Sequence, residues 1–286
     1  MSFVHLHCHS EFSLLDASVR VGELVKKAAA FGMPAVAVTD HGNLHAAVPF
    51  YQAARKAGVK PIIGCEVYVA PGSMLERNGS SAKDSAYHLT LLATDAEGYG
   101  NLVKLVTSAH LEGFYYKPRV DRERLAAHAK GLIALSGCVK GEVPTLLAGA
   151  RMKEAKETVA AYRDIFGPEN YFIELTEFGL DAQRRVNPEV ILLAREFGLG
   201  LADMAVRDHP ADDPVAPRLG RFGFADRAVI GRCLGHRRRI PHRIFCAFRA
   251  LRPRPTPLLP LRLHTEQQGE VGTCIVASLW CAQAPV

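Results

Sequence analysis

Hydrophobic and polar positions follow two different periods along residues 1–201, and they predict strands that alternate with helices. Short apolar runs typical of buried strands lie at residues 3–6, 35–38, 59–69, 88–93, 131–136 and 171–175. Helical periodicity covers residues 19–31, 43–57, 96–108, 151–166 and 181–197, the last after an irregular start around Asn187-Pro188. Residues 70–85, rich in glycine, serine and charge, predict an exposed loop.

Strands that alternate with helices predict an α/β fold whose parallel sheet is connected by crossover helices. A barrel and an open doubly wound sheet both satisfy this pattern. The polar residues favour the barrel, because they lie in or just after many strands, as functional residues of such barrels do; they are His7, His41, Glu66, His88 and Cys138. An open sheet would gather them at one crevice, and the chain has no Gly-x-Gly-x-x-Gly turn or phosphate-loop motif.

Three alternating histidines, His5, His7 and His9, open the chain. Alternate residues of a strand point to one face, so two of these histidines can bind one metal ion. Asp16 follows in the next loop and offers a carboxylate. Histidine and carboxylate ligands suit zinc, manganese or iron. The alternative is a polar strand face that binds nothing.

Further candidate ligands follow the apolar strands. Asp40-His41 comes directly after the strand at 35–38, and Glu66 stands inside an apolar run, where an unpaired carboxylate would be costly to bury. Taken singly, His88 is a core histidine and Cys138 a small buried hydrophobe. Taken together, the set exceeds what one four-coordinate metal needs and suits two or three metals that share a carboxylate. Such clusters hydrolyse phosphate esters.

The composition bounds where such a protein works. No apolar run approaches the roughly 18 residues of a membrane span, and the N-terminus lacks the basic-then-apolar pattern of a secretion signal. The seven cysteines are scattered, with no Cys-x-x-Cys pair, which is typical of reduced thiols. We therefore expect a cytoplasmic protein without a membrane partner.

Several motifs resemble those of the PHP (polymerase and histidinol phosphatase) superfamily: His7-Cys8-His9 with Asp16, Thr39-Asp40-His41-Gly42, Gly64-Cys65-Glu66, the strand at 88–93, and Leu135-Ser136-Gly137-Cys138. The resemblance is closest to the N-terminal PHP domain of bacterial DNA polymerase III alpha subunits. Residues 109–119 and 183–188 agree with that subfamily. The resemblance covers residues 1–201, and its motif begins at His7, so His5 drops out.

The resemblance implies a distorted seven-stranded (β/α) TIM-like barrel with two or three divalent metal ions (zinc, manganese or iron). It implies that His7, His9 and a bridging Glu66 hold one metal. His88 and Cys138 would hold the second with that carboxylate, and Asp16 and His41 the third. Asp16, His41 and Glu66 are also the implied catalytic residues. The domain is a 3′–5′ proofreading exonuclease in some members and a structural platform in others, so DNA and other replicative polymerase subunits are the implied partners.

The chain departs from the family at the last motif, an Asp-x-His at the end of the final strand. Here residues 202–210 contain no Asp-x-His, and Asp203 or Asp208-His209 could substitute only at a different spacing. We therefore expect an incomplete final strand, reduced metal occupancy and impaired hydrolysis.

Residues 202–286 form a tail of different composition. Residues 1–202 hold 22 basic and 22 acidic residues, whereas residues 203–286 hold 13 basic residues, all arginine, and 7 acidic ones, which accounts for the net charge of +6. One interpretation is a basic arm that binds nucleic acid. The favoured one is a truncated or frameshifted GC-rich gene, because shifted frames of such genes are rich in arginine and proline. On it the tail is disordered, and this chain has no polymerase active site.

The leading hypothesis is thus the PHP domain of a replicative polymerase, with residues 1–201 as a phosphoesterase and residues 202–286 as an irregular tail. Two alternatives remain: a non-catalytic scaffold for replication subunits, and a free-standing phosphatase that acts on a small phosphate ester. Lys117, Arg119 and Arg185 are candidate contacts for substrate phosphate, although each can equally be a solvated surface charge.

Overall fold

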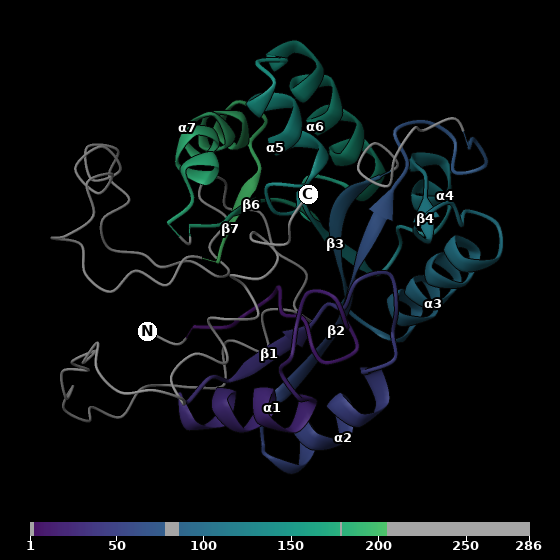
Figure 1. Ribbon diagram of the computed structural model, residues 1–286. Helices are drawn as coiled ribbons and strands as arrows, with labels where there is room; N and C mark the ends of the chain where they lie inside the picture. The colour runs from purple at the N-terminus through teal and green to yellow at the C-terminus, as the bar shows by residue number, and fades with distance from the viewer. Residues whose placement is uncertain (1–2, 78–85, 178, 205–286) are drawn as a thin grey trace, which may run out of the picture.

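Residues 3–77, 86–177 and 179–204 are described by this computed structural model, in which a mixed sheet curls into a half-barrel with helices outside it (Figure 1). The strands of this part are β1 (Ala35–Val38), β2 (Lys60–Val69), β3 (Tyr87–Ala93), β4 (Arg119–Val120), β5 (Leu132–Leu135), β6 (Tyr171–Leu175) and β7 (Gly200–Asp203). Its helices are α1 (Val21–Ala30), α2 (Ala47–Lys56), α3 (Ala96–Leu111), α4 (Arg122–Ala127), α5 (Glu142–Ala148), α6 (Met152–Phe166) and α7 (Asp181–Glu196).

The strand order is β1-β2-β3-β5-β6-β7, and β4 pairs with β2 beside this path. The predicted seven-stranded, barrel-like fold is confirmed. The expectation of a purely parallel sheet is wrong at β3, which runs antiparallel to both β2 and β5. A parallel neighbour needs a long crossover connection, usually a helix, and the described residues between β2 and β3 contain no helix. Reversing β3 places its first residues beside the last residues of β2.

The strands alternate between an inner and an outer face, as the period of two requires. In β2, Ile62 and Glu66 face the barrel interior, whereas Val67 packs outward against the main hydrophobic core. In β3, Leu92 and His88 share the inner face. The inner face of both strands is thus apolar at one end and polar at the other.

Three groups of helices cover the outer face (Figure 1). α1 and α2 lie together beside β1, where Leu24 and Phe50 pack with Val36 and Val38. α5, α6 and α7 cover the far end of the sheet, and α3 and α4 lie between the two groups. Across the ranges that the structure describes, no helix is both long and apolar enough to cross a bilayer.

The N-terminal segment differs from its prediction, because residues 3–6 do not form a regular strand. The segment instead lies along the outer edge of β1. The amide of Ala37 donates to the carbonyl of His5 at 2.8 Å, and that of Thr39 donates to the carbonyl of Cys8 at 2.7 Å. These two bonds hold the segment against β1 on either side of His7 and directly before His9.

The C-terminal part of the described chain also differs in detail. α7 runs without a break through Pro188, so the predicted irregular start of this helix is wrong. β7 continues through Asp203, and the amide of Met204 donates to the carbonyl of Leu175 at 2.8 Å. The predicted tail lies, apart from its first three residues, outside the described part of the chain, so its disorder and its origin stay predictions.

Candidate metal centre

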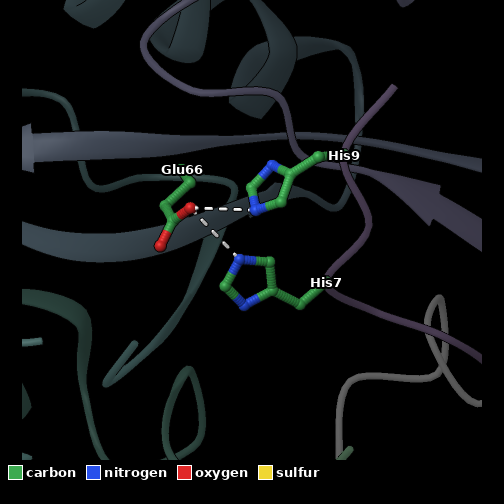
Figure 2. Close-up of side chains that lie close together, drawn as sticks. All are labelled: His7, His9 and Glu66. Atoms are coloured by element: carbon green, nitrogen blue, oxygen red, sulfur yellow. Dashed lines mark ion pairs between the residues drawn. The ribbon is translucent and has the colours of Figure 1, made fainter. Parts of the chain in front are cut away.

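Four histidines surround one buried carboxylate, that of Glu66, whose side chain is fully enclosed. Its Oε2 atom lies 3.3 Å from Nε2 of His7, 3.1 Å from Nε2 of His9 and 3.0 Å from Nδ1 of His41. Its Oε1 atom lies 2.7 Å from Nδ1 of His88. Figure 2 shows the rings of His7 and His9 pointing at the same carboxylate oxygen.

The strand arrangement explains this convergence. His41 follows β1, and its neighbours pair with β2, because the amide of Gly42 donates to the carbonyl of Glu66 at 2.9 Å. The backbone amide of Glu66 donates in turn to the carbonyl of Asp40 at 3.1 Å. His88 stands near the start of β3, and the reversed direction of that strand brings it to the same end of the barrel.

Asp40, beside the predicted ligand His41, fixes the loop that carries Asp16. Its carboxylate accepts hydrogen bonds from the amide and the hydroxyl of Ser10, at 2.6 and 2.7 Å, and from the hydroxyl of Ser13 at 2.7 Å. The amide of Asp16 donates to the carbonyl of Ser13 at 2.8 Å. The carboxylate of Asp16 consequently lies 3.0 Å from Nε2 of His41, on the more open side of the site.

Cys138 completes the predicted set at the end of β5. Its Sγ atom lies 3.8 Å from Oε1 of Glu66 and 3.9 Å from Nδ1 of His88. Gly137 allows this approach, because a Cβ atom there would lie 2.5 Å from the carbonyl oxygen of His88. All seven predicted metal ligands therefore lie at one end of the barrel, and their role as ligands stays a prediction.

Glu174, in β6, belongs to the same cluster and was missed by the sequence analysis. Its Oε1 atom lies 2.8 Å from Nδ1 of His7, and its Oε2 atom is buried without a hydrogen-bond partner. Burial raises the pKa of this carboxyl group. The signal was present in the sequence, because a glutamate inside the apolar strand Tyr171–Leu175 is the same anomaly that singled out Glu66.

The charges of the cluster depend on one another. Burial raises the pKa of Glu66, but the neighbouring His88, His41 and His7 outweigh it and hold that pKa well below its usual range. Burial likewise lowers the pKa of His41, but the carboxylates of Glu66 and Asp16 outweigh it and raise the pKa to about 9. The pKa values of His7 and His88 are also raised. The pKa values of three of the four imidazoles are thus raised by the buried carboxylates, whereas burial lowers the pKa of His9.

The donor atoms fit a metal cluster. In the part of the chain that the structure describes, five buried ring nitrogens make no hydrogen bond of normal geometry, namely Nε2 of His7 and both ring nitrogens of His9 and of His41. Four of these five lie 3.0–3.3 Å from a carboxylate oxygen, where a cation between nitrogen and oxygen would satisfy both. The described residues contain two sets of possible ligands, and within each set all the ligand atoms lie within 4.8 Å of one another. One set is His7, His9 and Glu66, and the other is His41, Glu66 and His88. Glu66 belongs to both sets, which is the arrangement of a carboxylate that bridges two metals. Histidine and carboxylate donors suit zinc, manganese or iron.

The three candidate phosphate contacts lie in different surroundings. The ammonium of Lys117 lies 4.4 Å from the ring centroid of Tyr68, whose ring stacks on His41 at 5.7 Å. Arg119 is only 3% exposed, and its guanidinium donates to two backbone carbonyls of the loop after β2, at 2.7 and 2.9 Å. Arg185 is exposed on α7. Only the lysine is thus next to the cluster, and a phosphate contact by any of the three stays a prediction.

Comparison with known protein families matches residues 5–177 to the PHP domain. The chain belongs to the PHP domain family. Its relatives include the DNA polymerase III subunit alpha of Treponema pallidum (strain Nichols), 48% identical over 201 residues, which cover 70% of this chain and 17% of the relative. The subunit of the same name from Thermus aquaticus is 48% identical over 204 residues, which cover 70% of this chain and 17% of the relative. That of Deinococcus radiodurans is 47% identical over 206 residues, which cover 70% of this chain and 15% of the relative.

These identities confirm the predicted resemblance of this PHP chain to the polymerase III alpha subunits, although it spans only about a sixth of their length. Two solved structures are similar at lower levels. An amidohydrolase from Chromobacterium violaceum, with bound sulfate and no metal, is 17% identical with a TM-score of 0.46, covering 71% of this chain and 86% of the other. A two-domain protein from Bacteroides vulgatus, containing a predicted PHP-like metal-dependent phosphoesterase, is 17% identical with a TM-score of 0.43, covering 69% and 49%.

Proposed function

We propose that this PHP domain hydrolyses phosphodiester bonds with two or three bound divalent metal ions, and that it removes nucleotides from the 3′ end of DNA as a 3′–5′ proofreading exonuclease. The observation that carries the proposal is the convergence of four imidazoles on the two oxygens of Glu66. The stability of the fold does not require four buried histidines around one carboxylate, whereas metal binding does. DNA as the substrate is supported by the relatives, which are subunits of a DNA polymerase.

The residues divide into three groups around the carboxylate. His7 and His9 would hold one metal with Glu66, while His88 and Cys138 would hold the second with the same glutamate. Asp16 and His41 would hold the third. When bound, the metals supply an activated water and neutralise the oxygens of the phosphate. Zinc, manganese and iron all suit this set of donors.

Two residues govern access and orientation at the site. The side chain of Asp16 is 19% exposed, whereas the side chain of its partner His41 is 7% exposed and that of Glu66 is enclosed, so the substrate approaches from the side of Asp16. Glu174 orients His7, because its carboxylate at 2.8 Å from Nδ1 directs Nε2 of that ring toward Glu66. Carboxylates behind metal-bound histidines commonly set the ring orientation in this way.

The missing Asp-x-His motif predicts weaker metal binding and slower hydrolysis than the complete ligand set would give. It also supports the alternative that this domain is a non-catalytic scaffold for replication subunits. The part of this chain that aligns with the three relatives covers 15–17% of their length. Hydrolysis of a small phosphate ester by a free-standing phosphatase is the other alternative.

Metal content and nucleotide release test the proposal together. The full chain is loaded with zinc, manganese or iron, its metal content is measured, and release from a 3′-labelled single strand is followed. Two or three metals per chain and release that Asp16→Asn abolishes are expected. His128→Gln is the control, because His128 follows α4 and belongs to neither group of candidate ligand residues. A chain that binds no metal contradicts the proposal and favours the scaffold, whereas hydrolysis of histidinol phosphate but not of DNA favours the phosphatase.

A further inference from the structure

A strained turn beside the metal centre presents an exposed aromatic ring. The amide of Tyr115 donates to the carbonyl of Lys117 at 3.0 Å, which closes a three-residue turn with Tyr116 at its tip. The φ angle of Tyr116 is +57°, in the left-handed region that a bulky side chain rarely adopts. Its side chain is nevertheless 55% exposed, so burial of the ring does not explain why the chain accepts this conformation.

The turn is attached to the residues of the metal centre. Lys117 lies over the ring of Tyr68, and that ring stacks on the predicted ligand His41 with an interplanar angle of 10°. Gly42 follows that histidine with a φ of +59°, and a Cβ atom there would lie 2.8 Å from Cγ of Pro118. The loop that carries the turn therefore packs directly on the backbone next to a metal ligand.

The second anchor of the loop is His110, near the end of α3. Its Nε2 atom lies 2.8 Å from the carbonyl oxygen of Gly42, and its ring lies 6.5 Å from that of Phe114. Phe114 is also 51% exposed. Two exposed aromatic rings and one lysine thus border the site on a loop whose ends are held in place.

Aromatic rings next to a cation are the chemistry that binds single-stranded nucleic acid. Bases stack on the rings whatever their sequence, and the cation lies along the phosphate backbone. Exposed aromatics also occur in protein interfaces. The lysine on the same turn favours the nucleic acid, because its ammonium lies over the ring of Tyr68, which stacks on His41, and a cation next to the predicted ligands attracts phosphate.

We propose that Tyr116 is a stacking platform for a base of a single-stranded nucleic acid whose terminal phosphodiester lies at the metal centre. Lys117 neutralises the phosphate between the two. The placement of the phosphodiester rests on the proposed function, whereas the stacking of a base on Tyr116 does not. The strain at Tyr116 is then maintained for binding rather than for the fold.

The test compares base-dependent binding in variants of the full chain. Fluorescence anisotropy measures binding of a labelled oligothymidylate and of an abasic strand of the same length, in an Asp16→Asn background that prevents hydrolysis. Tyr116→Gly removes the ring and also suits the positive φ, so the fold is retained or stabilised. We expect this variant to bind oligothymidylate about tenfold more weakly, as the loss of one stacked base predicts, and to bind the abasic strand unchanged.

Two further variants serve as controls. Tyr116→Phe keeps the ring and should bind within about twofold of the parent. Tyr51→Ala removes a ring of similar exposure, 52%, from α2 at the other end of the barrel, and should change nothing. The proposal is overturned if Tyr116→Gly binds oligothymidylate as the parent does, or if it loses as much affinity for the abasic strand. Tyr116 would then be a candidate for a contact with another protein.

The result also separates the platform from the proposed function. Binding that depends on both the bases and Tyr116, in a protein that releases no nucleotides with Asp16 restored, supports the platform although the nuclease fails. Nucleotide release by a protein whose Tyr116→Gly variant binds normally overturns the platform alone.

Discussion

The two ends of the barrel interior are built from the same strands but from opposite chemistry. Ile62 and Glu66 share one face of β2, about 13 Å apart at the usual rise of a strand, and Leu92 and His88 share one face of β3. At the Ile62 end, apolar side chains surround a cavity of about 700 Å³, lined by residues that include Leu6, Ile62, Leu92, Ile133 and Phe172. At the other end, the carboxylate and histidines of the candidate metal centre are buried together.

The difference shows how the strands separate stability from chemistry. Burial of the apolar end stabilises the fold in proportion to the area that is removed from water. Burial of charged groups opposes folding unless each group finds a partner. The polar end satisfies this condition by pairing Glu66 with histidines, at a geometry that also suits metal ions. Substitutions at the apolar end should therefore lower the free energy of unfolding, whereas substitutions at the polar end should lower metal affinity.

The largest effect is expected for Glu66→Gln. Both sets of ligand atoms contain this carboxylate, so the loss of its charge should remove metal from both positions and abolish nucleotide release. Metal content and activity are measured on the same purified sample. Circular dichroism provides the control, because the change preserves the volume of the side chain. Full metal content in this variant would contradict the role of Glu66 as a bridge.

Leu92→Ala sharpens the comparison from the apolar end. Loss of a buried leucine typically costs about 2–5 kcal/mol of unfolding free energy, and the lower half of that range is expected because the site already borders a cavity. Urea denaturation of the metal-free protein measures the cost. Metal affinity, measured under native conditions, should not change. A metal affinity that falls in parallel with stability would show that the two ends are not separable.

Glu174→Gln should weaken metal binding without unfolding the protein. The amide oxygen can still accept a hydrogen bond from His7, but it lacks the charge that strengthens the ring as a ligand. Loss of such carboxylates typically costs about 10–100-fold in metal affinity, and the lower end is expected here. Competition with a chromophoric chelator measures the affinity. Equal affinity in the variant and the parent would leave Glu174 a residue of the fold.

Metal affinity should rise with pH. The pKa of His41 is raised to about 9, so this ring carries a proton in the metal-free protein at neutral pH, and the pKa values of His7 and His88 are shifted in the same direction. A metal needs the neutral ring, and each binding event must release protons below that pKa. Affinity should increase from pH 6 to about pH 9 and then level off. Calorimetry in two buffers of different ionisation heat counts the released protons. Metal binding without proton release at pH 7 would contradict the pairing of protonated histidines with Glu66.

Sequence patterns predicted most strands and the convergence of the candidate ligands on one end of the barrel, because both follow from local periodicity and from residue type. The assignment of ligands to individual metals came from the family resemblance and stays a prediction. They could not give the direction of β3, since alternation looks the same whichever way a strand runs. β4 is too short to show a period. The buried bonding of Arg119 depends on a loop more than 40 residues away in the chain. Glu174, in contrast, was visible, and applying the reasoning used for Glu66 to every acidic residue in an apolar strand would have found it.

The central claim is that Glu66 bridges metals at the polar end of the barrel. Anomalous X-ray diffraction from crystals of the full chain, grown with zinc, manganese or iron and recorded at the absorption edge of that metal, tests it directly. The account predicts at least two anomalous peaks, one on each side of the Glu66 carboxylate, with His7 and His9 at one and His88 at the other. A single peak or none at this carboxylate, in crystals grown with each of the three metals, would contradict it.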